Sequence, residues 1–389
     1  NAAWRLTEEN FMKGQDILSD LKIRASYGLT GNQDIDNYAF ASMYYTNIST
    51  SSYPIAGDPN SVTQGISKES IGNPDLKWET TTQTNIGIDA GLFNNKLNLS
   101  FDFYHKYTTD ILQRITYPST GGVASAPFMN IGEMQNQGFE LSIGGDIIRT
   151  KDWDWNIEIN LGHNKNKLKK LYKTKNAEGQ FVEKPIIISD GTSIAGTAKR
   201  VLQPGYPCDT YYLKEWAGVN PENGAPQWYK TVENEDGTLS RQKTSNYSEA
   251  DQVKCGSSSP DIFGGFSTVL RWKDIDLNAV FGYSVGGQIY NYSRQEYDSD
   301  GAYNDRNQMK LQKGWNRWEK PGDIATHPVA SYSNTSKSNS SSSRYLEKND
   351  YLKLRSLSIG YNLKLPQYYI NNMRIFFTGE NLFCVTNYS

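Results

Sequence analysis

The sequence predicts an all-β protein, an antiparallel transmembrane β-barrel, and three observations carry the prediction. Apolar and polar residues alternate along many segments, these segments are long, and they are joined alternately by tight turns and long polar loops. Successive strand side chains point to opposite faces, so alternation gives a strand one apolar face and one polar face. Short turns at one end and long loops at the other are typical of an outer-membrane barrel.

The clearest alternation lies in the segment 153–161, where every odd position is apolar and every even position is Asp, Asn or Glu. A helix with this spacing would scatter its apolar residues around the whole axis. Near Ser356 the alternation changes phase, which predicts a β-bulge. We expect about ten strands, at residues 1–6, 21–31, 78–92, 96–110, 136–149, 153–167, 260–272, 275–290, 350–363 and 373–384.

Tight turns are expected at 93–96, 149–152 and 271–274. Long loops are expected at 32–77, 111–135, 168–258 and 291–349. Several strands also reach the ~9 to 11 tilted residues that cross a bilayer. In the barrel layout the turns are periplasmic and the loops extracellular.

Composition agrees with this class and excludes others. Hydrophobic residues make up only 37% of the 389 residues, and no run approaches the ~18 to 20 apolar residues of a membrane-spanning helix. A transmembrane β-barrel contains no such run, because only alternate residues of each strand face lipid. The formal net charge of −2 argues against a general nucleic-acid binder.

Aromatic residues gather where the expected strands meet turns or loops. Two belts at fixed heights would mark the two membrane interfaces, although strands favour aromatic residues in any case. The turn-side group is Phe93, Trp153, Trp155 and Trp272, and the loop-side group is Trp78, Tyr107 and Tyr290.

Motifs for catalysis are missing from the sequence. It contains no GxxxxGK[ST], HExxH, GxSxG or CxxC pattern, so we expect no catalytic residues, no enzyme activity and no cofactor. One loop, with Asp298, Asp300, Asn304 and Asp305, spaces oxygen ligands somewhat like a calcium loop, although it lacks the EF-hand pattern. A solvated acidic turn is the alternative, and we expect no metal.

Cysteine usage leaves one question open. Cys208 and Cys255 could pair across a long loop, but three cysteines do not make a disulfide scaffold, and free thiols are the preferred interpretation.

Aromatic residues are also frequent inside the long loops. Their rings would pack on sugar rings or peptide side chains, and their polar groups would add hydrogen bonds. The alternative is that large loops need small cores of their own. The candidates for substrate contact are Tyr44, Tyr45, Tyr211, Tyr212, Trp216, Trp228, Tyr229, Tyr297, Tyr303 and Trp315.

Several blocks of sequence resemble the SusC/RagA family of TonB-linked outer-membrane transporters. They span nearly the whole chain in the order expected for that family. The blocks are 21–32 (LKIRASYGLTGN), 72–79 (GNPDLKWE), 130–140 (NIGEMQNQGFE), 218–224 (GVNPENG), 259–261 (SPD) with 264–266 (GGF), 349–355 (NDYLKLR) and 379–383 (GENLF).

The resemblance implies a 22-stranded barrel with an N-terminal plug, which imports glycans or peptides using energy delivered through TonB. It also implies a SusD-like surface lipoprotein that captures cargo as a hinged lid. Ten strands cannot close such a barrel. The expectation is therefore that residues 1–389 are the C-terminal part of a transporter barrel, without the plug, the N-terminal extension and the final strand.

A soluble β-rich carbohydrate-binding domain is the main alternative. It would also use alternating strands and exposed aromatic residues. In that case the apolar faces would pack against one another in a core.

Overall fold

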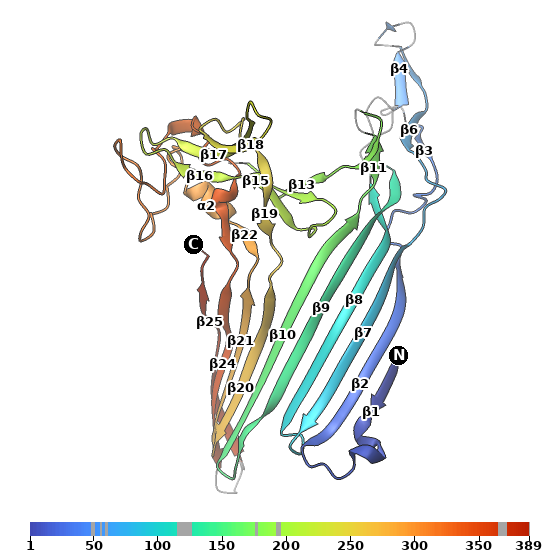
Figure 1. Ribbon diagram of the computed structural model, residues 1–389, viewed down its shortest axis with the longest axis vertical. Coiled ribbons are helices and arrows are strands. Elements are labelled where there is room, and N and C mark those ends of the chain that lie inside the picture. The colour runs from blue at the N-terminus through green and yellow to red at the C-terminus, as the bar shows by residue number, and fades with distance from the viewer. Residues whose placement is uncertain are drawn as a thin grey trace.

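The computed structural model describes residues 1–47, 51–54, 57–58, 61–114, 127–175, 178–191, 196–364 and 372–388. Within these ranges the long strands form one ten-stranded antiparallel sheet whose spatial order follows the chain order (Figure 1). Its strands are β1 (Ala2–Arg5), β2 (Leu18–Asn32), β7 (Glu79–Leu92), β8 (Leu97–Arg114), β9 (Phe128–Arg149), β10 (Trp153–Lys170), β20 (Ile262–Trp272), β21 (Ile275–Val285), β24 (Tyr351–Lys364) and β25 (Asn372–Thr386).

Each expected strand is present, and β8, β9 and β10 are longer than expected at the loop end. The three tight turns are confirmed, because at most four residues separate β7, β9 and β20 from the strand that follows each of them. In the first of these turns Phe93, Asn94 and Asn95 all have positive φ angles of 55° to 59°. Left-handed backbone of this kind favours Asn, which explains the Asn-Asn pair in the turn.

The predicted bulge is also confirmed. Strand β24 pairs with β21 in register except for a shift between Leu354 and Ser356, which leaves Arg355 as the extra residue. The pairing of β24 with β25 is interrupted at the same place, where Arg355 faces Asn381 and Leu382.

Small sheets fill the loop end of the molecule (Figure 1). The first long loop holds β3 (Met43–Tyr45) paired with β6 (Ser67–Ser70), and β4 (Ser52–Pro54) paired with β5 (Val62–Gln64). Strands β11 (Lys173–Lys175) and β12 (Phe181–Glu183) form a hairpin above β10. Two short 3-10 turns, η1 (Leu6–Glu8) and η2 (Asn10–Met12), connect β1 to β2.

The remaining small elements belong to what we call the outer unit, the described residues of 184–258 and 286–349. It combines a four-stranded sheet, a three-stranded sheet, a two-stranded pair, one short helix and two 3-10 turns. Its elements are β13 (Ile186–Asp190), β14 (Ala198–Leu202), β15 (Thr210–Lys214), β19 (Gln252–Ser257), β16 (Trp216–Val219), β17 (Pro226–Glu233), β18 (Leu239–Thr244), β22 (Gln288–Tyr290), β23 (Leu346–Lys348), α2 (Tyr292–Tyr297), η5 (Tyr332–Asn334) and η6 (Ser343–Tyr345).

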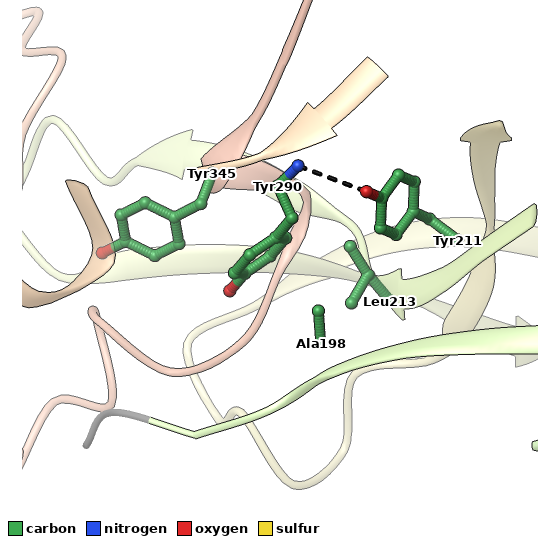
Figure 2. Packing of buried hydrophobic residues seen from close by; sticks show 5 residues of the cluster. All are labelled: Ala198, Tyr211, Leu213, Tyr290 and Tyr345. Carbon is green, nitrogen blue, oxygen red and sulfur yellow. Dashed lines mark hydrogen bonds between the residues drawn. The ribbon is translucent and has the colours of Figure 1, made fainter. Parts of the chain in front are cut away.

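A buried aromatic cluster lies at the centre of the outer unit. Tyr345 is fully buried and packs near Tyr290, while Leu213 and Ala198 complete the cluster with Tyr211 (Figure 2). The backbone N–H of Tyr290 donates to the Tyr211 hydroxyl over 3.3 Å. The sequence prediction that Tyr290 belongs to a membrane belt is therefore wrong, since its ring is buried in this core.

No helix within the described ranges is long and apolar enough to cross a membrane.

Candidate functional site

The large sheet has one apolar face and one polar face, and the strand register aligns them across the sheet. Ile159 pairs with Ile143 on one side and with Phe266 on the other. Phe266 then pairs with Phe281, whose ring stacks at a centroid distance of 4.4 Å. Side chains on this apolar face are open to the surroundings; Ile159 is 43% exposed. A soluble domain would bury this face, so the soluble alternative is wrong.

The height of the apolar face matches a membrane. On β10 it begins at Trp153, whose ring stacks on Trp272 at the turn end, and it extends to His163. Ten strand residues rise about 33 Å, and a tilt of roughly 40° leaves about 25 Å, the usual height of a barrel's apolar band. Tyr107 lies on the same face near the loop end, next to His105.

Polar residues occupy the opposite face and line a hollow of about 490 Å³. The lining includes Asp89, Ser142, Glu158 and Asn160, from strands β7, β9 and β10. Gly265 and Gly282 pair with each other in the same row as Asn160, and the Arg355 side chain lies over Gly282.

An arginine connects three strands of this polar face. Arg24 on β2 donates through Nε to Asp89 on β7 over 2.8 Å, and through Nη2 to Asp102 on β8, also over 2.8 Å. Ser100 donates to Asp89 over 2.8 Å and completes the group. The pair partner of Arg24 on β7 is Gly87, which leaves the space that the guanidinium crosses.

A buried charge network organises the outer unit. Arg344, whose side chain is 2% exposed, contacts Asp300 at 2.5 Å and Asp298 at 3.3 Å. Asp300 also accepts from Arg317 over 2.8 Å, and His327 Nε2 donates to Asp298 over 3.0 Å. Burial alone would raise the pKa of Asp298, but the His327 hydrogen bond and the arginine charges outweigh it and lower that pKa.

This network corrects the interpretation of the loop around Asp298. Asp298 and Asp300 are neither a solvated acidic turn nor arranged as calcium ligands, because arginine side chains engage both carboxylates. Asn304 and Asp305 are exposed, and Asp305 pairs with Arg306 over 3.4 Å. Among the described residues no cluster of three or more acidic, His or Cys side chains could hold a metal ion.

The candidate aromatic residues differ in how much of each ring is accessible. Trp228 and Tyr211 are buried, and Trp228 packs edge-on against Trp216 at 5.7 Å and Tyr247 at 5.2 Å. These rings form the cores that long loops need, which removes Trp228 and Tyr211 from the accessible surface.

Arginine side chains cover four other candidate rings. Guanidinium groups lie 3.8 to 5.0 Å from the ring centres, the geometry of a cation–π contact. The pairs are Tyr229 with Arg241, Trp216 with Arg344, Trp315 with Arg294, and Tyr303 with Arg306.

The other candidates keep more of their rings accessible. Tyr44 and Tyr45 lie on β3, where Tyr44 is exposed, and Tyr212 is half-buried on β15. Tyr297 is 49% exposed and lines a separate hollow of about 410 Å³ with Met309 and Tyr388. The structure does not bring the β3 tyrosines into that hollow.

The described cysteines are all free. Cys208 Sγ lies 3.6 Å from the Met134 sulfur, and Cys255 Sγ donates to the Leu213 carbonyl over 3.7 Å. Burial raises the pKa of the Cys255 thiol to about 11. The expectation of free thiols is confirmed.

Comparison with known proteins decides the family. The model of the family "TonB dependent receptor-like, beta-barrel" matches residues 1–251. The chain belongs to the TonB-dependent receptor family. As a TonB-dependent receptor barrel it is an outer-membrane protein, and the family is one of receptors and transporters rather than enzymes.

The relatives of this TonB-dependent receptor chain confirm the SusC/RagA resemblance. It is 32% identical to TonB-dependent receptor P3 of Formosa agariphila over 99% of its own length and 37% of that protein. It is 31% identical to TonB-dependent receptor SusC of Bacteroides thetaiotaomicron over 77% of its length and 28% of that protein.

A solved structure titled "Structure of the RagAB peptide transporter" matches with a TM-score of 0.76 and 29% identity, over 99% of this chain and 39% of that one. The chain thus spans less than half the length of the relatives it matches.

Proposed function

We propose that this chain supplies wall strands and outer loops to a transporter that imports a nutrient oligomer, a glycan or a peptide, through the outer membrane. The polar wall opposite the apolar band is the observation that carries the proposal. It offers a hydrated surface with small side chains along the direction of transport. Membership of the TonB-dependent receptor family supports import driven through TonB, without catalysis on the cargo.

The proposal includes the rest of a longer polypeptide. Residues 1–389 are proposed to be the C-terminal part of a barrel of about 22 strands, and the match over only 39% of the RagAB chain supports their being one part of a longer polypeptide. Strands β1 and β25 each pair on one side only in the described structure. Lipid cannot satisfy unpaired backbone groups, so further strands must continue the sheet at both edges. The plug and the contact with TonB belong to those other segments.

The outer loops are proposed to contact cargo and a SusD-like lid lipoprotein. Tyr297 is the best-supported cargo contact of the candidate set, since its ring is half exposed and lines a hollow with the apolar side chain of Met309. Tyr44 belongs to the β3–β6 pair, which lies beyond the end of the long strands (Figure 1), and we assign this pair to contact with the lid.

Uptake by the complete transporter tests this function. Cells carrying the full-length gene should accumulate labelled oligosaccharides or oligopeptides, and the class that accumulates identifies the cargo. Accumulation should stop when the TonB protein is deleted or the proton gradient is collapsed, and should fall when the lid gene is deleted. Accumulation that is independent of TonB, or absent for both classes, would contradict the proposal.

A further inference from the structure

Two lysines extend the lipid-facing side of β10 above the apolar band. The pairing of β10 with β9 is regular from Asn156 to Leu168, so alternate residues stay on one face throughout. Lys165 and Lys167 therefore share a face with Ile159 and Leu161, and both are exposed. They lie at the end of the strand that leads into the long loops, which is the extracellular end of a barrel.

Neither lysine has an acidic cross-strand neighbour on this face of β9 and β8. Across β9 and β8, Lys165 is in line with Gln137 and His105, and Lys167 with Gln135 and Tyr107. Cross-strand neighbours of this kind interact most directly on a sheet face, and none of these four is acidic. The face at this height thus carries positive charge on a neutral background.

The carboxylate of Glu133, near the loop end of β9, is already engaged. Glu133 contacts Lys170 at 2.5 Å, and it accepts a hydrogen bond from the Tyr107 hydroxyl. No ion pair or hydrogen bond is formed by the ammonium groups of Lys165 and Lys167 within the described part of the chain. Side chains two apart on one strand face are about 7 Å from each other, close enough for one anionic group to contact both.

We propose that Lys165 and Lys167 bind the phosphate group of an outer-leaflet lipid. The apolar band below them would hold the acyl chains, and the lysines would meet the headgroup at the level where the hydrocarbon ends. Positive residues at this level attract anionic headgroups. The Tyr107 hydroxyl and the Gln135 and Gln137 amides provide further hydrogen-bonding groups at the same site.

The position of the site favours a lipid over a protein or the cargo. The lysines are on the opposite face from the polar wall, so cargo beside that wall does not meet them. A soluble partner would have to displace lipid to reach the side chains just above Leu161. A lipid that is already anchored in the bilayer needs no such displacement.

The test uses the complete transporter, purified in detergent and stripped of lipid. A phosphorylated lipid A and the same lipid with its phosphate groups removed are added in turn, and retention is measured by native mass spectrometry. Retention of the phosphorylated form should fall about twenty-five-fold in the double variant Lys165→Gln/Lys167→Gln, since each juxtamembrane lysine contributes roughly fivefold.

Two matched variants separate charge loss from general damage. Lys96→Gln/Lys151→Gln removes two lysines at the turn end and should leave retention unchanged, and Lys165→Arg/Lys167→Arg should retain the phosphorylated lipid. Heat-modifiable migration on gels checks that every variant is folded. Equal retention of the phosphorylated and dephosphorylated lipids by the unmodified transporter would overturn the proposal. Unchanged retention of the phosphorylated lipid in the folded double-Gln variant would also overturn it. So would displacement of the bound lipid by millimolar inorganic phosphate as effectively as by added phosphorylated lipid.

Discussion

Arg24 and Asp102 are joined by a hydrogen bond of 2.8 Å although a whole strand, β7, lies between them. The guanidinium passes over Gly87, where an added Cβ would come within 2.4 Å of the Asp102 carboxylate and 2.8 Å of Arg24 Cζ. Gly87→Ala should therefore displace the arginine and cost about 1–3 kcal/mol. Urea unfolding of the complete transporter in detergent measures this cost.

Gly28→Ala is the matched control for that change. Gly28 lies on the polar face of the neighbouring strand β2, and a Cβ there meets nothing within 4 Å. Equal unfolding midpoints for the two variants would show that the contact of Arg24 with Asp102 does not require a glycine at position 87.

The two faces of β10 should respond oppositely to one new charge. Ile157→Arg places a guanidinium on the apolar face near the middle of the band and should cost ~2–4 kcal/mol, enough to impair assembly. Glu158→Arg puts the same side chain on the polar face, one residue away, and should assemble. Heat-modifiable migration on gels reports assembly, and equal tolerance of both variants would refute the assignment of faces.

The buried charge network should be essential to the outer unit. Arg344→Ala leaves two buried carboxylates, Asp298 and Asp300, without their shared partner and should cost about 3–5 kcal/mol. Lys364→Ala breaks an ion pair with Asp274 whose lysine is 80% exposed and should cost at most ~1 kcal/mol. Limited proteolysis, monitored by cleavage within residues 286–349, compares the two variants. Equal protease resistance of the two variants would mean that the network is dispensable.

The same network predicts acid sensitivity. The pKa of Asp298 is lower in the folded chain than the usual value of ~3.9. Its contribution to stability is therefore present above that value and is lost as pH falls through the folded pKa. Protease sensitivity of the outer unit should rise on acidification below about pH 4. In Asp298→Asn the outer unit should be less stable at neutral pH and its acid response smaller; an unchanged acid response would exclude Asp298 as the titrating group.

The hollow beside Tyr297 makes a prediction about cargo. Tyr297→Ala should weaken cargo binding by about fivefold or more, as the loss of an aromatic contact commonly does. Tyr332→Ala is the control, because Tyr332 is 68% exposed and does not line the hollow. Titration calorimetry with the cargo class identified by uptake measures both affinities. Equal losses for the two tyrosines would remove Tyr297 from the binding surface.

The strands were predictable because their signal is local. In the segment 153–161 the polarity of each side chain predicts which face of the sheet it occupies. The phase change at Ser356 likewise predicted a bulge. The outer unit was not predictable in this way. Asp298 and Asp300 look like a solvated turn until Arg344, 44 residues beyond Asp300, is brought beside them. Tyr290 follows a strand-like pattern, yet its ring contacts depend on Tyr345 and Tyr211 from distant segments.

Which aromatic loop residues have accessible rings was not predictable from the sequence for a similar reason. Composition identifies rings that will be in contact with something, but it does not say whether the contact is internal. The internal contacts come from arginines, with Arg241 over Tyr229 and Arg344 over Trp216. No spacing pattern in the sequence predicts these pairs.

The central cluster of the outer unit also sets an order of assembly. Tyr211 precedes the β20–β21 hairpin and Tyr345 follows it, so their shared core closes a loop that contains that hairpin. Contacts between such distant segments form late, because a large loop must close before they can be made. We therefore expect the wall strands to insert before the outer unit folds, and a transporter stalled with unpaired strands would expose an unfolded outer unit to proteases.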